Sequence, residues 1–140
     1  MSQEKIFTLD EANRILPLVR SITRDAARRY RTIKDEILAL GRLKAERRAG
    51  RDVSMDEVRR LDASIENHLD ELRRLIGELE ALGCRLRDYD RGVVDFPAAT
   101  MDGDQFVFYC WMSGEPEVTH WHREEEGFEH RRLLRVQAPA

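Results

Sequence analysis

The sequence has few cysteines and no long uninterrupted apolar run. Two cysteines, Cys84 and Cys110, are too few for a disulfide framework, so we expect two buried thiols in a reducing compartment. No run approaches the roughly 18 apolar residues that a membrane-spanning helix needs. The first residues also lack the basic start and apolar stretch of a secretory signal. We therefore expect a cytoplasmic protein with no membrane partner.

Charge of one sign is also not in excess, because the net charge of the 140 residues is only -3. Residues 14–51 hold twelve Lys or Arg against four Asp or Glu, giving +8, whereas residues 52–83 hold four against nine, giving -5. If these two stretches lie side by side, the acidic one neutralises the basic one. Nucleic acid is then an unfavourable partner, since a phosphate backbone requires an open basic face. The length and the 41% hydrophobic content predict one soluble globular domain over residues 1–140.

Two long stretches have apolar residues at helical spacing, and each begins with a capping signal. Thr8 to Glu11 and Ser54 to Glu57 both fit the capping box, in which a hydroxyl and a carboxylate satisfy free backbone donors. We expect helices over 9–48, with a kink at Pro17, and over 55–82, ending at Gly83. The short polar turn between them predicts an antiparallel hairpin over 8–83, in which His68 hydrogen-bonds within the bundle.

From Cys84 onward the pattern changes to short β-branched and aromatic runs separated by Gly, Asp and Pro. This pattern is typical of an antiparallel meander. The expected strands are 84–88, 93–96, 106–112 and 118–122. The sequence thus predicts an α+β fold, with the long helical hairpin followed by a small antiparallel sheet over 84–136 that packs at one end.

The lengths of these elements predict a dimer. A helix over 9–48 is about 60 Å long, whereas a strand of five or six residues covers only about 20 Å. So small a sheet cannot cover the apolar faces of both helices. We expect a second copy of the hairpin to cover the rest, which makes a homodimer through a four-helix arrangement.

Several short stretches are distinctive in their order along the chain. They are Phe7 to Asn13, Leu16-Pro17, Asp88 to Pro97, Cys110-Trp111, Gly114-Glu115 and Trp121-His122, followed by Gly127 and Arg131. Together they resemble a family of uncharacterised bacterial and archaeal proteins, the domain of unknown function 2203. The resemblance implies no known activity. It places the family's distinctive residues mainly in the sheet half, at Asp88, Asp95, Pro97, Trp111, Glu115, Trp121, His122 and Arg131.

His120 and His122 form an H-x-H on an expected strand, where alternate side chains point to one face. Both imidazoles could therefore meet a metal such as Zn or Fe, with a further ligand from Glu115, Asp95, His130 or Cys110. The alternative is two ordinary strand histidines beside an aromatic residue. In the family that the chain resembles, the positions of His120 and His130 are usually aromatic and glycine, so a site needing all three histidines would be peculiar to this protein.

Acid/base chemistry is a further hypothesis. Glu115 and His122 could face each other as a carboxylate and imidazole pair, although Glu115 in Gly-Glu-Pro also fits a turn residue. Asp88 and Asp95 could surround a pocket with Arg131, whose planar fork suits a small anionic ligand. Alternatively, Asp95 accepts backbone donors at a strand end. Trp111 and Trp121 line either that pocket or the core.

The sequence favours a homodimerising scaffold or a ligand- or partner-binding module without catalysis, because no nucleophile motif accompanies these residues. Its expected ligand-binding residues are Asp88, Asp95, Trp111, Glu115, Trp121, His122 and Arg131. The alternative is a metal-dependent or acid/base enzyme of hydrolase type on the C-terminal sheet. There His122 and Glu115 would be the catalytic candidates, and His120, His122 and Glu115 the metal ligands.

Overall fold

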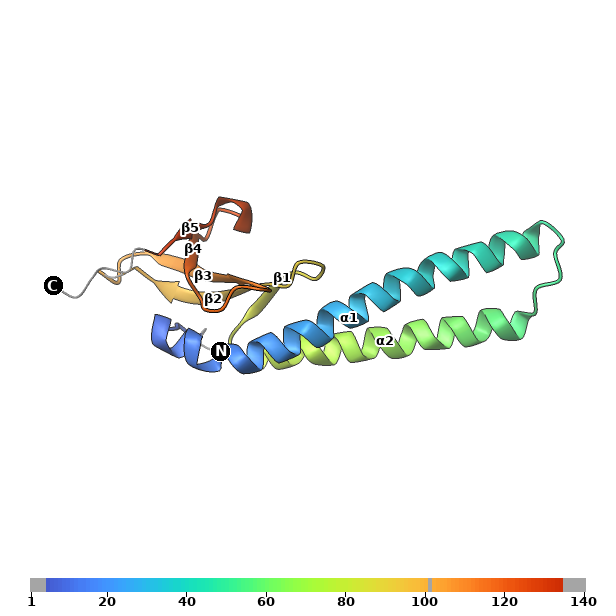
Figure 1. Ribbon diagram of the computed structural model, residues 1–140, viewed down its shortest axis with the longest axis horizontal. Coiled ribbons are helices and arrows are strands. Elements are labelled where there is room, and N and C mark those ends of the chain that lie inside the picture. Colours follow the sequence, from blue (N-terminus) through green and yellow to red (C-terminus); the bar gives the residue numbers. More distant parts are fainter. Residues whose placement is uncertain (1–4, 101, 135–140) are drawn as a thin grey trace.

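The structure, a computed structural model, describes residues 5–100 and 102–134 (Figure 1). Two long helices come first and an antiparallel sheet follows, which confirms the expected α+β layout. The elements are α1 (Leu9–Arg48), α2 (Met55–Ala81), β1 (Arg85–Asp88), β2 (Val93–Ala99), β3 (Phe106–Met112), β4 (His120–Arg123), the short 3-10 helix η1 (Phe128–His130) and β5 (Arg132–Leu133).

The helix boundaries follow from local capping. Thr8 forms the full capping box with Glu11, as predicted. Ser54 instead accepts from the Asp56 N–H at 3.1 Å, so the start of α2 uses a different cap from the expected box. Gly83 follows α2 with a φ of 94°, the left-handed conformation that ends helices. Within the hairpin, His68 Nδ1 accepts a hydrogen bond from Arg29 Nη1 at 2.7 Å, as expected for a polar residue in the bundle.

The five strands lie in the sheet in chain order, each antiparallel to its neighbour. β2 extends three residues further than predicted, to Ala99, and β4 begins at His120 rather than at residue 118. β5 was not predicted, because two residues are too few for a periodic pattern. Gly92 and Gly114 occupy the expected turns with positive φ.

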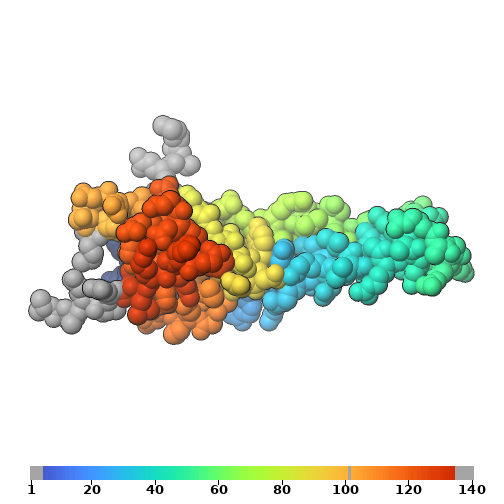
Figure 2. Space-filling view, turned by 90° about the horizontal axis from the view of Figure 1, so that it is seen from above, coloured from blue at the N-terminus to red at the C-terminus, as the bar shows by residue number. Residues whose placement is uncertain are grey.

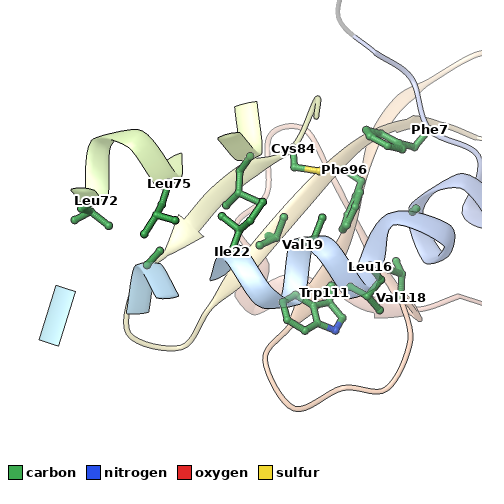
Figure 3. Packing of buried hydrophobic residues seen from close by; sticks show 14 of the residues in the cluster. Phe7, Leu16, Val19, Ile22, Leu72, Leu75, Cys84, Phe96, Trp111 and Val118 are labelled. Atoms are coloured by element: carbon green, nitrogen blue, oxygen red, sulfur yellow. The ribbon is translucent and has the colours of Figure 1, made fainter. Parts of the chain in front are cut away.

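The two faces of the sheet differ in character. One face contributes Val94, Phe96 and Trp111 to an apolar core with both helices, as Figure 3 shows. Since successive side chains of a strand point to opposite faces, the residues between these point away from the helices. On β2 and β3 these alternate positions are Asp95 and Cys110, which pair across the two strands.

The start of α1 passes beneath the sheet and is tied to it. The Phe7 N–H donates to Pro97 O at 2.7 Å, and the Val118 N–H donates to Asn13 Oδ1 at 2.7 Å. Pro17 lies inside α1, and Figure 1 shows that the first turns run at an angle to the rest of the helix. The kink expected at Pro17 is therefore present, and the turns before it fold under the sheet.

Beyond the sheet, the hairpin projects alone. Figure 2 shows this part, which we call the arm (residues 34–71), extending away from the sheet. Val58 and Ile65 are buried in the arm, whereas Ile37 and Leu38 are 52% and 60% exposed. Among the described residues, neither helix combines the length and the apolar content that crossing a bilayer requires.

Candidate functional site

Three polar side chains are buried together on the sheet face that points away from the helices. Asp95 comes from β2, Cys110 from β3 and His122 from β4, and their ligand-type atoms all lie within 4.8 Å of one another. Asp95 is 1% exposed, His122 2% and Cys110 0%. Asp95 lies opposite Cys110, and His122 lies opposite Phe108, two residues from Cys110 on the same strand. The register of three strands thus creates this cluster.

Asp95 is the centre of a buried ionic network. Its carboxylate oxygens lie 3.0 and 3.1 Å from His122 Nε2, and Arg87 Nε donates to Oδ2 at 2.9 Å. His122 Nδ1 lies 2.9 Å from the carbonyl oxygen of Arg123. The imidazole of His122 and the guanidinium of Arg87 therefore satisfy the Asp95 carboxylate in the interior.

Arg87 reaches Asp95 from the neighbouring strand β1. Arg85 pairs with Asp95 and Leu86 with Val94, but the next pair is Asp88 with Val93, so β1 has one additional residue, a bulge. Because side chains alternate along a strand, Arg87 lies on the same face as Arg85 and Asp95.

Cys110 joins this network to a second one. Burial raises the pKa of its thiol to about 12, and the negative charge of Asp95 adds to this shift. The positive charge of Arg131 acts in the opposite direction and lowers the pKa of the thiol, but it does not outweigh burial. Cys110 is therefore a protonated thiol at neutral pH, located between a carboxylate and a cation.

The second network is built on Glu115. Arg131 Nη1 and Nη2 donate to its two oxygens at 2.8 Å each, and the Met112 N–H donates to Oε1 at 2.7 Å. Burial alone would raise the pKa of Glu115, but the hydrogen bonds from Arg131 and Met112 outweigh burial and hold this pKa below its usual value. His120 Nδ1 lies 3.5 Å from Glu115 Oε2.

A cavity of about 270 Å³ lies over Asp95 and His122. Phe108 from β3 and Phe128 from η1 contribute aromatic walls. The remaining lining residues are Arg87, Glu124, Glu126, Gly127 and Glu129. Carboxylates outnumber cations in this lining, with Asp95 and three Glu against Arg87 and His122. Glu126 is also paired with Arg132, at 3.0 and 3.1 Å.

The structure thus divides the predicted site residues between two networks. His122 and Asp95 meet, whereas Glu115, His120 and Arg131 gather in the neighbouring group. Glu115 and His122 do not pair with each other, because each has its own charged partner. The anion-binding fork of Arg131 is likewise occupied by Glu115.

Three further predicted residues have roles in the fold. Asp88 accepts from the Arg91 N–H at 2.7 Å in the turn after β1. Trp111 is buried against the helices, and its Nε1 donates to the carbonyl oxygen of Glu115 at 2.9 Å. Trp121 packs against the guanidinium of Arg132, 5.0 Å from its ring centre.

Sequence reasoning missed Arg87 and the lining from Glu124 to Glu129. No local pattern indicates the pairing of β1 with β2 that brings Arg87 beside Asp95. Cys110 was one of several alternative third ligands, and only strand pairing selects it. Once the register of the three strands is known, side-chain alternation places Asp95, Cys110 and His122 on the same face.

Comparison with known proteins identifies a family but no activity. The sequence profile of a family described as "Uncharacterized conserved protein (DUF2203)" matches residues 5–134. No curated protein and no solved structure matches the chain.

Proposed function

The chain belongs to the DUF2203 family of uncharacterized conserved proteins, and we propose that this member is a non-catalytic module that binds a small cation in the cavity over Asp95 and His122. The observation that carries this proposal is the cavity itself. At about 270 Å³ it is slightly below the range of roughly 300–1,000 Å³ for typical ligand pockets, so the ligand is small.

The charge of the lining supports a cation rather than an anion. Asp95 is matched by Arg87 and His122, and Glu126 is matched by Arg132. The excess negative charge of the lining therefore comes from Glu124 and Glu129. A cleft lined by one excess sign of charge concentrates the opposite ion.

Hydrogen bonding in the site supports binding rather than acid/base catalysis. A general base must offer a free lone pair to the substrate. Both nitrogens of His122 are engaged, with Asp95 and with the carbonyl oxygen of Arg123. Both oxygens of Glu115 are engaged with Arg131, which also keeps this carboxylate a weak base. Each catalytic candidate would therefore first have to lose a buried partner.

A thermal-melting experiment tests the cation site. Tetramethylammonium, methylammonium, zinc and acetate are each added to the whole protein. We expect at least one of the cations to raise Tm, and acetate to have no effect. The double variant Glu124→Gln/Glu129→Gln should weaken binding, whereas Glu117→Gln, an exposed carboxylate outside the lining, should not. Stabilisation by acetate alone, or by none of the ions, would refute the proposal.

A second observation supports self-association of the arm with a second copy of the chain. Ile37 and Leu38 are large apolar residues exposed on the arm, where no strand covers them. The stretch 14–51 is basic and 52–83 is acidic. α1 of one copy therefore complements α2 of another in charge, as a two-fold interface requires.

Light scattering over a range of concentrations tests the dimer. We expect twice the 16.4 kDa chain mass for the natural protein and the single-chain mass for Ile37→Glu/Leu38→Glu. Leu133→Glu is the matched control, because Leu133 is equally exposed but lies on β5. A single-chain mass for the natural protein at every concentration would rule out the arm as a dimer interface.

A further inference from the structure

We propose that Asp95, Cys110 and His122 bind one Zn²⁺ ion. This inference rests on the proposed cation site, because it identifies the cation and places it on the floor of the same cavity. The three side chains come from adjacent strands, so the sheet holds the three donors as one rigid unit.

The spacing of the donors fits a zinc ion. Two donors each about 2.0–2.1 Å from a tetrahedral zinc lie about 3.3 Å apart. His122 Nε2 and the Asp95 oxygens are 3.0 and 3.1 Å apart, so they need to separate only slightly. The Cys110 sulfur is within 4.8 Å of both and has to approach by on the order of 1 Å at most. A change of this size is within the reach of side-chain torsions.

The surroundings of the donors are those of a metal site. A histidine that binds metal through one nitrogen usually donates the other N–H to a carbonyl or carboxylate, which fixes the ring. His122 Nδ1 donates to the carbonyl oxygen of Arg123, which directs Nε2 toward Asp95 and Cys110. Arg87 Nε holds Asp95 Oδ2, which leaves Oδ1 for the ion. The positive charge of Arg131 favours the thiolate form of Cys110.

Charge balance also permits the ion. A cysteine binds zinc as the thiolate, so Cys110 gives up its proton on binding. The thiolate and the Asp95 carboxylate then match the two positive charges of Zn²⁺, and no unpaired charge is buried.

The donor set selects the type of metal. One thiolate and one imidazole exclude Mg²⁺ and Ca²⁺, which require oxygen ligands, and they suit zinc. Asp95 and His122 both line the cavity, so a fourth position on the ion can be filled from that side. The set His120, His122 and Glu115 is less suitable, because Arg131 and the Met112 N–H already occupy the Glu115 oxygens.

Cobalt titration of the whole, tag-free protein tests the site, since Co²⁺ replaces Zn²⁺ in such sites and has visible spectra. After chelator treatment and dialysis, we expect one equivalent of Co²⁺ with a thiolate-to-cobalt charge-transfer band, displaced by one equivalent of Zn²⁺. Cys110→Ser should abolish the band and weaken zinc binding, measured against a chromophoric chelator, by more than about 100-fold. Asp95→Asn and His122→Gln should also weaken it.

Cys84→Ser is the matched control, because Cys84 is equally buried but belongs to the apolar core on the helix side. It should retain both the band and the affinity. If a site variant fails to fold by circular dichroism, the near-isosteric Cys110→Ser decides the outcome. Unchanged affinity in Cys110→Ser would overturn the proposal, as would loss of the band in Cys84→Ser or loss of binding only in Glu115→Gln or His120→Gln.

The zinc proposal and the cavity proposal can fail separately. If neither Zn²⁺ nor Co²⁺ binds but tetramethylammonium still raises Tm in a Glu124- and Glu129-dependent way, the metal site is refuted and the cation cavity stands. If no cation has any effect, both are refuted.

Discussion

The sheet end of the molecule is packed on two sides, whereas the arm is packed on one. In the sheet, Phe96 and Trp111 are buried toward the helices, and Asp95 and His122 are buried on the opposite face. In the arm, two helices enclose a single line of apolar contacts and leave Leu38 exposed. The difference shows where this chain can bury polar groups. Charged side chains need partners from several directions, and adjacent strands provide them while a two-helix hairpin does not.

The largest expected effect is in the apolar core under the sheet. Trp111→Ala removes a fully buried indole and its hydrogen bond to the Glu115 carbonyl oxygen, so it should cost about 3–5 kcal/mol of unfolding free energy. Ile65→Ala in the arm should cost about 2 kcal/mol, the low end for such a change, because the arm can close around the gap. Urea unfolding followed by circular dichroism measures both. Equal losses would contradict the proposed difference in packing.

Breaking a buried ion pair should cost much more unfolding free energy than breaking an exposed one. Asp95→Ala leaves His122 and Arg87 without their counter-charge in the interior, and we expect a loss of about 3 kcal/mol in metal-free buffer. Asp90→Ala breaks the exposed pair with Lys34 and should cost less than about 1 kcal/mol. Chemical denaturation of the two variants side by side makes the comparison. A loss under 1 kcal/mol for Asp95→Ala would mean that the buried network adds little stability.

Glycine substitutions should have opposite signs in the helices and at the sheet. Gly41 and Gly77 lie inside helices with open space around them, so changing either to alanine should stabilise by about 0.5–1 kcal/mol. Gly92 has a φ of 69°, and an added Cβ would overlap Ser113 Oγ. Gly92→Ala should therefore destabilise by more than about 1 kcal/mol. Thermal unfolding provides the values, and a stabilised Gly92→Ala would show that this turn can rearrange.

The smallest expected effect is a pH dependence at the start of α1. The hydrogen bond from Lys5 and those of the Thr8 cap lower the pKa of Glu11 from 4.5 to about 2. A pKa that is lower in the folded state adds stability above pH 4.5, and this stability is lost as the pH falls toward 2. Glu11→Gln should therefore flatten part of the natural protein's decline between pH 4.5 and 2. Identical profiles for the two proteins in acid denaturation would remove Glu11 as a contributor.

The helical hairpin and the sheet also differ in how well the sequence predicted them. The hairpin was predicted nearly to the residue, because caps such as Thr8, stops such as Gly83 and the helical period are all local signals. Four strands were also found, with ends that range from exact, as in β3, to three residues short, as in β2. For the site, the sequence indicated residues that take part but not which of them contact one another. One hypothesis paired His122 with Glu115, whereas Asp95, on another strand, is its partner.

The sequence by itself determined the secondary structure and the apolar face of each helix, since these depend on neighbours within a few positions. Only the tertiary structure decided that Asp95, Cys110 and His122 form one cluster while Glu115 and Arg131 form another. The reason is that strand register acts between residues that are 12 to 27 positions apart, and a shift of one residue would exchange the two faces. The register of β1 on β2 likewise brings Arg87 beside Asp95.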